Sequence, residues 1–126
     1  MNNKISKWFY LIGKVLIVVV FLYFGIESIF MPDTYSGLVP DFVASIISPE
    51  WLVMLHGAVE VIFALFVLFN LGGVYSYMIL ILSFMSVLIT VSSTTFVRDV
   101  GILGGLLILI SNFIANYQEE LDSIES

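Results

Sequence analysis

The chain has 126 residues, of which 60% are hydrophobic and 11% charged, and its mean hydropathy is +1.12. Because soluble domains carry about 25% charged residues, this composition excludes an ordinary soluble protein and predicts a single membrane domain over residues 1–126. The net charge is −6, and there is no basic patch for nucleic acid. One histidine and no cysteine exclude disulfides, thiol chemistry and a zinc or bis-histidine haem site built from this chain alone.

Four apolar segments are long enough to cross a bilayer, which takes about 20 residues. They cover approximately residues 8–30, 51–69, 74–94 and 100–117. The short connections "NLGG" and "TTFVRD" predict that consecutive helices are antiparallel neighbours. The expected fold class is therefore all-α: a polytopic membrane protein in which four transmembrane helices form an antiparallel bundle.

The lysines near the N-terminus predict the orientation of this bundle. Lys4, Lys7 and Lys14 flank the first span and should remain cytoplasmic, which places both termini inside. In this orientation Arg98 lies on the outer side, which is contrary to the preference of Lys and Arg for the cytoplasm. It is one basic residue against the three lysines. No small-residue cleavage site follows the first span, so we expect that span to be retained. The expectation is a multi-pass protein of the plasma (cell inner) membrane, surrounded by the lipid bilayer.

The connection between the first two spans, "MPDTYSGLVPDFVASIISPE", contains a helix signal of its own. Pro40 suits the start of a helix, and Asp41 follows in the first turn, where the helix dipole favours a carboxylate. Four apolar residues then share one side: Phe42, Val43, Ile46 and Ile47. We expect a short interfacial helix over the outer end of the bundle, ended by Pro49. The alternative is an ordinary ordered loop.

Five ionisable side chains fall in the outer half of the predicted bundle. Glu27 lies near the outer end of the first span, and Arg98 and Asp99 open the fourth. His56 and Glu60 are four residues apart in the second span, so they lie on one helix face. Because a charge that faces lipid costs roughly 2.5–3.5 kcal/mol on insertion scales, these groups should face the interior or a wet cavity.

Two interpretations of these five side chains remain open. They form either a buried polar network that fixes helix register or a ligand or proton site, and the cost of charge inside a membrane favours the site. Taken singly, Asp99 suits a helix N-cap and Arg98 can snorkel to the interface.

On the third span, hydroxyl side chains either line the same cavity or serve ordinary packing: Ser83, Ser86, Thr90 and Ser93.

Glycines are the candidates for close helix packing. They are Gly57 in the second span, and Gly101 and Gly105, which form a GxxxG pair in the fourth. No group of residues suggests a metal site, and no residue is assigned a catalytic role.

Three stretches of the chain together resemble a known family: "YFGIESIFMPDTYSGLVPDFV", "HGAVEVIFALFVLF" and "RDVGILGGLLILI". Their order and spacing over about residues 10–115 are similar to the DoxX family of small four-helix membrane proteins. In that family the second span carries Gly and Glu three apart, here Gly57 and Glu60. The fourth opens with Arg-Asp-x-Gly, here Arg98, Asp99 and Gly101. The resemblance implies an association with membrane redox complexes, such as a thiosulfate:quinone oxidoreductase.

The preferred function is an accessory subunit of a membrane redox complex, which would have a protein partner and a quinone or another small ligand in the outer half of the bundle. His56 or Glu60 would hydrogen-bond that ligand. One alternative is a proton or small-solute transporter, and another is a structural or assembly subunit of a larger membrane complex. Many DoxX proteins have a basic residue or His near the position of Glu27 and a basic pair where this chain has "NLGG". That difference speaks against an anionic substrate.

Overall fold

The computed structural model describes residues 3–90 and 93–126, and within these ranges the chain is helical and has no strand. Its elements are α1 (Asn3–Phe30), α2 (Asp33–Ser36), α3 (Asp41–Ala44), α4 (Pro49–Leu68), α5 (Gly73–Thr90) and α6 (Ser93–Glu125). Among the described residues, α1, α4 and α6 are long and apolar enough to cross a membrane, and α5 is apolar but shorter, over Gly73–Ile89. The all-α class is confirmed, and the apolar helices agree with a membrane protein.

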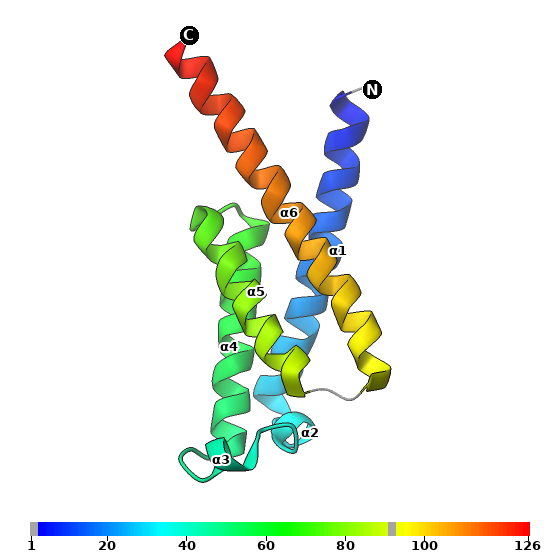
Figure 1. Ribbon diagram of the computed structural model, residues 1–126, viewed down its shortest axis with the longest axis vertical. Helices are drawn as coiled ribbons and strands as arrows, with labels where there is room; N and C mark the ends of the chain where they lie inside the picture. The colour runs from blue at the N-terminus through cyan, green and yellow to red at the C-terminus, as the bar shows by residue number, and fades with distance from the viewer. Residues whose placement is uncertain (1–2, 91–92) are drawn as a thin grey trace.

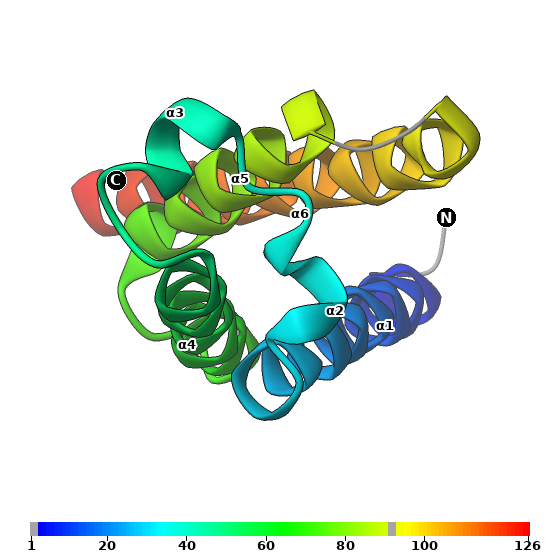
Figure 2. The ribbon, with the colours of Figure 1, turned by 90° about the horizontal axis from the view of Figure 1, so that it is seen from below.

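The two ends of the chain lie at one end of the molecule, and α2 and α3 lie at the other (Figure 1). The chain runs along α1 toward α2 and α3, and α4 leads back from them. The most extensive contact is between α1 and α4, while α5 packs on α4 and on α6, and α6 touches α1 more lightly. Viewed from the end that carries α2 and α3, the four long helices are arranged around a common centre (Figure 2).

Two glycines bring the backbones of α1 and α4 into contact. A Cβ atom placed on Gly57 would lie 2.6 Å from the carbonyl oxygen of Gly25 and 2.7 Å from Ser28 Cβ. A Cβ atom on Gly25 would lie 2.9 Å from the carbonyl oxygen of Gly57. Close packing of this kind holds helices together in a membrane, where lipid tails offer no hydrophobic driving force. Gly57 therefore sits at the crossing of α1 and α4, opposite Gly25.

An apolar core fills the middle of the molecule. Its buried side chains come from all four long helices: Val18, Phe21, Ala64, Val67, Tyr77, Leu80, Phe84, Leu106 and Leu109. Gly105 lets α6 approach α1, because a Cβ atom there would lie 2.8 Å from Ile17 Cδ1. Gly101 is exposed and has no atom within 4 Å of such a Cβ position. The two glycines of the GxxxG pair therefore do not form one packing surface within the described chain.

The connection from α4 to α5 is a tight reversal over "FNLGG". Asn70 adopts a left-handed conformation with φ of 56°. The N–H groups of Asn70 and Leu71 donate to the carbonyl oxygens of Val67 (3.3 Å) and Phe66 (2.7 Å), which is the pattern of a Schellman motif. The two glycines that follow also have positive φ, so this short connection ends α4 and begins α5 without strain on a bulky side chain.

Polar contacts lie between the apolar core and the chain ends. Lys14 Nζ donates to Asn70 Oδ1 at 2.5 Å, which ties α1 to the connection between α4 and α5. The hydroxyl groups of Tyr10 and Tyr77 lie 3.4 Å apart. Lys14 is only 2% exposed, so its amino group lies inside the molecule, next to the amide oxygen of Asn70.

The beginning of α6 corrects the prediction for the fourth span. The sequence predicts a break over "TTFVRD" and a span from about residue 100, but α6 begins at Ser93. Asp99 therefore lies within the helix and is not its N-cap. The stretch is polar, which predicts a connection, but it contains neither Gly nor Pro, and no residue in it prevents helix formation. The helix also continues to Glu125, past the predicted end at residue 117, because the acidic tail is rich in Glu, Gln and Leu, which favour helices.

The predicted third span, residues 74–94, corresponds to α5, which is described as far as Thr90. Residues 91–92, which belong to the predicted span, lie outside the described ranges. The side chains of Thr90 and Ser93, two of the four hydroxyl residues predicted to line the cavity or serve packing, lie outside the described side chains as well.

The predicted interfacial helix is present only as one turn. Pro40 is the N-cap of α3, which ends at Ala44. Ile46 and Ile47 lie in the turn after it, where their N–H groups donate to the carbonyl oxygen of Val43 at 3.0 and 3.1 Å. Pro49 does not end α3. It is instead the first residue of α4, a position that needs no backbone N–H.

Candidate functional site

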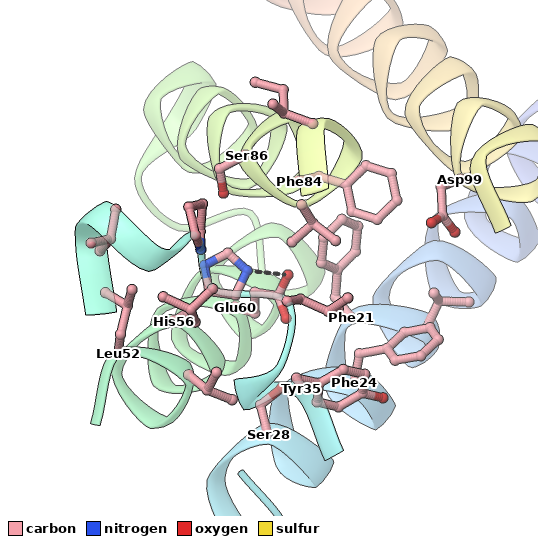
Figure 3. A pocket seen from close by; sticks show the side chains of 18 of the residues that line it. Phe21, Phe24, Ser28, Tyr35, Leu52, His56, Glu60, Phe84, Ser86 and Asp99 are labelled. Atoms are coloured by element: carbon pink, nitrogen blue, oxygen red, sulfur yellow. Dashed lines mark ion pairs between the residues drawn. The ribbon is translucent and has the colours of Figure 1, made fainter. Parts of the chain in front are cut away.

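A cavity of about 490 Å³ opens at the end of the molecule that carries α2 and α3. All four long helices contribute to its wall, and the segment between α1 and α4 adds Tyr35, Leu38, Val39, Pro40 and Val43. The lining is mostly aliphatic and aromatic, with a few polar side chains that point inward (Figure 3). A concave, mainly apolar site with a few convergent polar groups is typical of small-molecule binding.

The α4 side of the cavity presents His56 and Glu60. Their one-turn spacing brings His56 Nε2 within 3.3 Å of Glu60 Oε1, an ion pair when the imidazole carries both protons (Figure 3). Glu60 is 4% exposed. Ser83 of α5 places its Oγ atom 3.3 Å from His56 Nδ1. The carboxylate is thus buried beside an imidazole whose ring is positioned by a hydroxyl of the neighbouring helix.

The α6 side of the cavity presents Arg98 and Asp99. Arg98 Nε donates to Asp99 Oδ1 at 2.9 Å, and its guanidinium lies 5.6 Å from the centre of the Phe24 ring. Asp99 is 3% exposed, whereas more than half of the Arg98 side chain is exposed. The buried carboxylate is therefore paired with a cation that lies at the mouth of the cavity and rests on an aromatic ring.

Tyr35 of α2 connects the outer segment to α1. Its hydroxyl donates to Glu27 Oε2 at 2.5 Å, and its ring lies 6.4 Å from that of Phe24. Burial, together with this hydrogen bond, raises the pKa of Tyr35 above its usual range. The phenol is therefore neutral at physiological pH and acts as the donor. Glu27 itself is not among the lining residues, so it contributes to the cavity by holding Tyr35.

Aromatic rings form the floor of the cavity next to the core. Phe21 of α1 and Phe84 of α5 meet edge to face, with ring centres 5.5 Å apart. Both are also members of the buried core cluster. The cavity therefore ends on a packed apolar layer, and a planar ring entering it would meet aromatic surfaces.

The structure brings four of the five predicted ionisable residues to one cavity: His56, Glu60, Arg98 and Asp99. Glu27 does not line the cavity but accepts a hydrogen bond from Tyr35, which does. Sequence reasoning missed Tyr35 and the three phenylalanines at positions 21, 24 and 84. An aromatic residue with a hydroxyl in the polar stretch "PDTYSG" was the available signal for Tyr35. The phenylalanines carry no signal, because apolar spans are rich in such residues.

The chemistry available in this cavity is hydrogen bonding and proton exchange around an apolar ligand. Two buried carboxylates, one imidazole and one phenol surround a space large enough for a small ring compound. Within residues 3–90 and 93–126, no three side chains of the usual metal-binding types come together.

Comparison of the chain with protein-family models, with curated proteins and with solved structures finds no match. The functional conclusion therefore depends on the residues of this cavity.

Proposed function

We propose that this chain is a DoxX-like membrane protein, an antiparallel bundle of four transmembrane helices that serves as an accessory subunit of a membrane redox complex and holds a quinone in its outer half. The observation that carries the proposal is the cavity of about 490 Å³, in which apolar walls from four helices meet a buried carboxylate and a partly exposed imidazole. Its volume lies in the range of roughly 300–1,000 Å³ that small-molecule sites occupy.

Four spans are supported by the lengths of the helices. Of the four long helices, α5 is the shortest, and its apolar part Gly73–Ile89 rises by roughly 26 Å at 1.5 Å per residue. That rise nearly matches a hydrocarbon core about 30 Å thick. Lys4 and Lys7 at the end that carries both termini favour a cytoplasmic location for that end. The cavity then opens toward the outer leaflet.

The distribution of polar groups favours ligand binding over conduction. In the described residues, the cavity groups and the Lys14–Asn70 contact lie on opposite sides of the apolar core. Val18, Leu80 and Leu106 in that core are at most 2% exposed. A proton or polar solute that entered the cavity would meet this packed layer, whereas a quinone needs only to enter and leave from the outer side.

The test is purification from the native membrane in a mild detergent, with mass spectrometry of protein partners and of extracted quinone. Wild type should carry a redox protein and quinone in stoichiometric amounts. Val20→Phe places a ring in the cavity wall and should reduce bound quinone at least tenfold. Val19→Phe is the matched control, because Val19 directly precedes Val20 in α1, is 53% exposed and does not line the cavity.

Two results would contradict the proposal. One is a wild-type chain that comes out alone and without quinone. The other is equal quinone content in Val20→Phe and Val19→Phe, with both variants folded as judged by helicity and elution volume.

A further inference from the structure

The hydrogen-bonding capacity that the protein leaves unused in the cavity consists mainly of acceptors. One carboxylate oxygen of Glu60 faces His56, and one of Asp99 accepts from Arg98. Among the side chains of residues 4–89 and 97–126, none hydrogen-bonds the second oxygen of either carboxylate, although both carboxylate side chains are more than nine-tenths buried. No fully buried polar side-chain atom in the described part of the chain lacks a hydrogen-bond partner. These two unpartnered oxygens are therefore not fully buried, and they are accessible from the cavity that both residues line.

Donors that point into the cavity are scarcer. Tyr35 uses its proton on Glu27, and Ser86 uses its proton on the carbonyl oxygen of Ser83. His56 also lines the cavity, but its Nε2 atom faces Glu60 and its Nδ1 atom faces Ser83, so both ring nitrogens already have protein partners. The Arg98 guanidinium has N–H groups besides the one that donates to Asp99, but its side chain is 56% exposed at the mouth. Ser28 remains as a buried hydroxyl that can donate or accept. A ligand at the bottom of the cavity therefore meets two carboxylate acceptors and one hydroxyl.

The two open carboxylates approach the cavity from different helices. Glu60 comes from α4 and Asp99 from α6, and the rings of Phe21 and Phe84 are drawn between them in Figure 3. A ring compound lying against these two rings would have one polar edge toward each carboxylate. Two acceptors on separate walls suit a ring with a hydroxyl group at each end, since each hydroxyl donates one hydrogen bond.

We propose that the cavity selects the reduced form of its ligand, a para-dihydroxy quinol, over the oxidised quinone. The proposal rests on the proposed function and specifies which redox form the site takes. A quinol donates from both hydroxyls to the oxygens of Glu60 and Asp99. A quinone offers only carbonyl oxygens, which would leave the second oxygen of each carboxylate without a donor and place acceptor against acceptor.

The experiment is a redox titration of decylubiquinone bound to the purified full-length chain, with detergent micelles lacking protein as the reference. Selective binding of the quinol raises the midpoint potential of the bound couple. Each tenfold preference corresponds to about 30 mV for a two-electron couple. We expect at least a tenfold preference, and therefore an upward shift of at least 30 mV at one fixed pH.

Substitutions of the acceptors test the cause of the shift. Glu60→Gln and Asp99→Asn keep the side-chain shape and replace one acceptor oxygen by an amide that donates, so each should lower the preference at least threefold. Glu50→Gln is the matched control, because Glu50 is an exposed carboxylate on the same helix as Glu60 and lies outside the cavity. It should leave the shift unchanged. Two independent acceptor variants keep the test valid if one of them does not fold.

The possible results separate this inference from the proposed function. Saturable binding with a midpoint potential equal to or below that of the reference overturns the quinol preference and leaves the quinone site intact. A preference that is unchanged in both Glu60→Gln and Asp99→Asn also overturns it. Absence of saturable binding, with Val20→Phe and Val19→Phe behaving alike, overturns the proposed site itself.

Discussion

Small residues at the crossing of α1 and α4 decide how close the walls of the cavity stand. Ser28 and Gly25 on α1 face Gly57 on α4, and one helical turn further along α4 lies Glu60. The crossing therefore determines how far the Glu60 carboxylate stands from α1. A side chain in place of either glycine would push apart the two helices that have the most extensive contact in the molecule.

We expect Gly57→Ala to destabilise the protein by about 1–3 kcal/mol, the usual cost of overpacking a close interface. The added methyl group would lie 2.6 Å from a backbone oxygen of α1, and a backbone cannot rotate away as a side chain can. Thermal unfolding in detergent, followed by circular dichroism, measures the effect. Gly104→Ala is the matched control, because nothing lies within 4 Å of a Cβ atom there. Equal stability of the two variants would show that α1 and α4 are not in close contact.

At the scale of elements, one hydrogen bond holds the outer segment against the long helices. Tyr35 lines the cavity, and its hydroxyl donates to Glu27 of α1. In the described part of the chain, no other side chain of residues 31–47 forms a hydrogen bond to a long helix. Three further hydroxyl bonds near this segment are local: Ser36 to Asp33, Ser45 to Phe42 and Ser48 to Glu50. The position of α2 over the cavity therefore depends strongly on Tyr35.

We expect Tyr35→Phe to loosen α2 without unfolding the long helices. A hydrogen bond to a charged group contributes about 1.5–3 kcal/mol, and half-burial reduces that to about 1 kcal/mol here. Backbone amides of residues 34–36 should therefore exchange with solvent roughly fivefold faster, as measured by hydrogen exchange with mass spectrometry. Tyr23→Phe, an exposed tyrosine on α1, should leave this exchange unchanged. Identical exchange of α2 in both variants would contradict the role of Tyr35.

The pH dependence of this bond follows from the raised pKa of Tyr35. A phenol whose pKa is higher in the folded than in the unfolded chain stabilises the fold fully below its ordinary pKa of about 10, and this contribution is lost as the pH rises above that value. The difference between wild type and Tyr35→Phe should therefore stay constant from pH 6 to pH 9.

At the scale of the whole molecule, its two ends differ in their polar groups. The end with the termini carries Lys4, Lys7 and the buried Lys14, while the opposite end carries the cavity with His56 and Glu60. The apolar core lies between them. This separation makes the orientation in the membrane the decisive fact for function, because it determines from which side the cavity is reached.

Single cysteines would test this orientation, since the chain contains no cysteine of its own. Ser45→Cys lies in the exposed turn after α3, and Ser126→Cys lies at the exposed C-terminus. A membrane-impermeant maleimide should modify Ser45→Cys in intact cells and Ser126→Cys only after permeabilisation. The reverse pattern would invert the orientation. Modification of both from one side would mean an even number of crossings between them, so that α5 or one of its neighbours does not span the membrane.

Hydropathy and composition by themselves determine much of this protein. Long apolar runs indicate an all-helical membrane chain, because a helix satisfies its backbone hydrogen bonds within one segment, whereas the strands of a membrane barrel are short and alternate in hydrophobicity. The four-residue spacing of His56 and Glu60 places them on one face of a helix. Local signals at Pro40 and "NLGG" locate a helix start and a chain reversal, which the structure shows as the N-cap of α3 and the reversal between α4 and α5.

What only the tertiary structure decides is which distant residues meet. The sequence places Arg98 and Asp99 in a break because they are polar, yet they lie inside α6 and reach the cavity from its side. Gly25 meets Gly57 through a contact that depends on how two whole helices cross, and Tyr35 meets Glu27 because α2 folds back toward α1. Apolar side chains look alike along every span, so hydropathy cannot tell which of them face lipid and which line a cavity. Which apolar residues face lipid and which line a cavity is determined by how the helices pack, and packing is a property of helix pairs and not of a single segment.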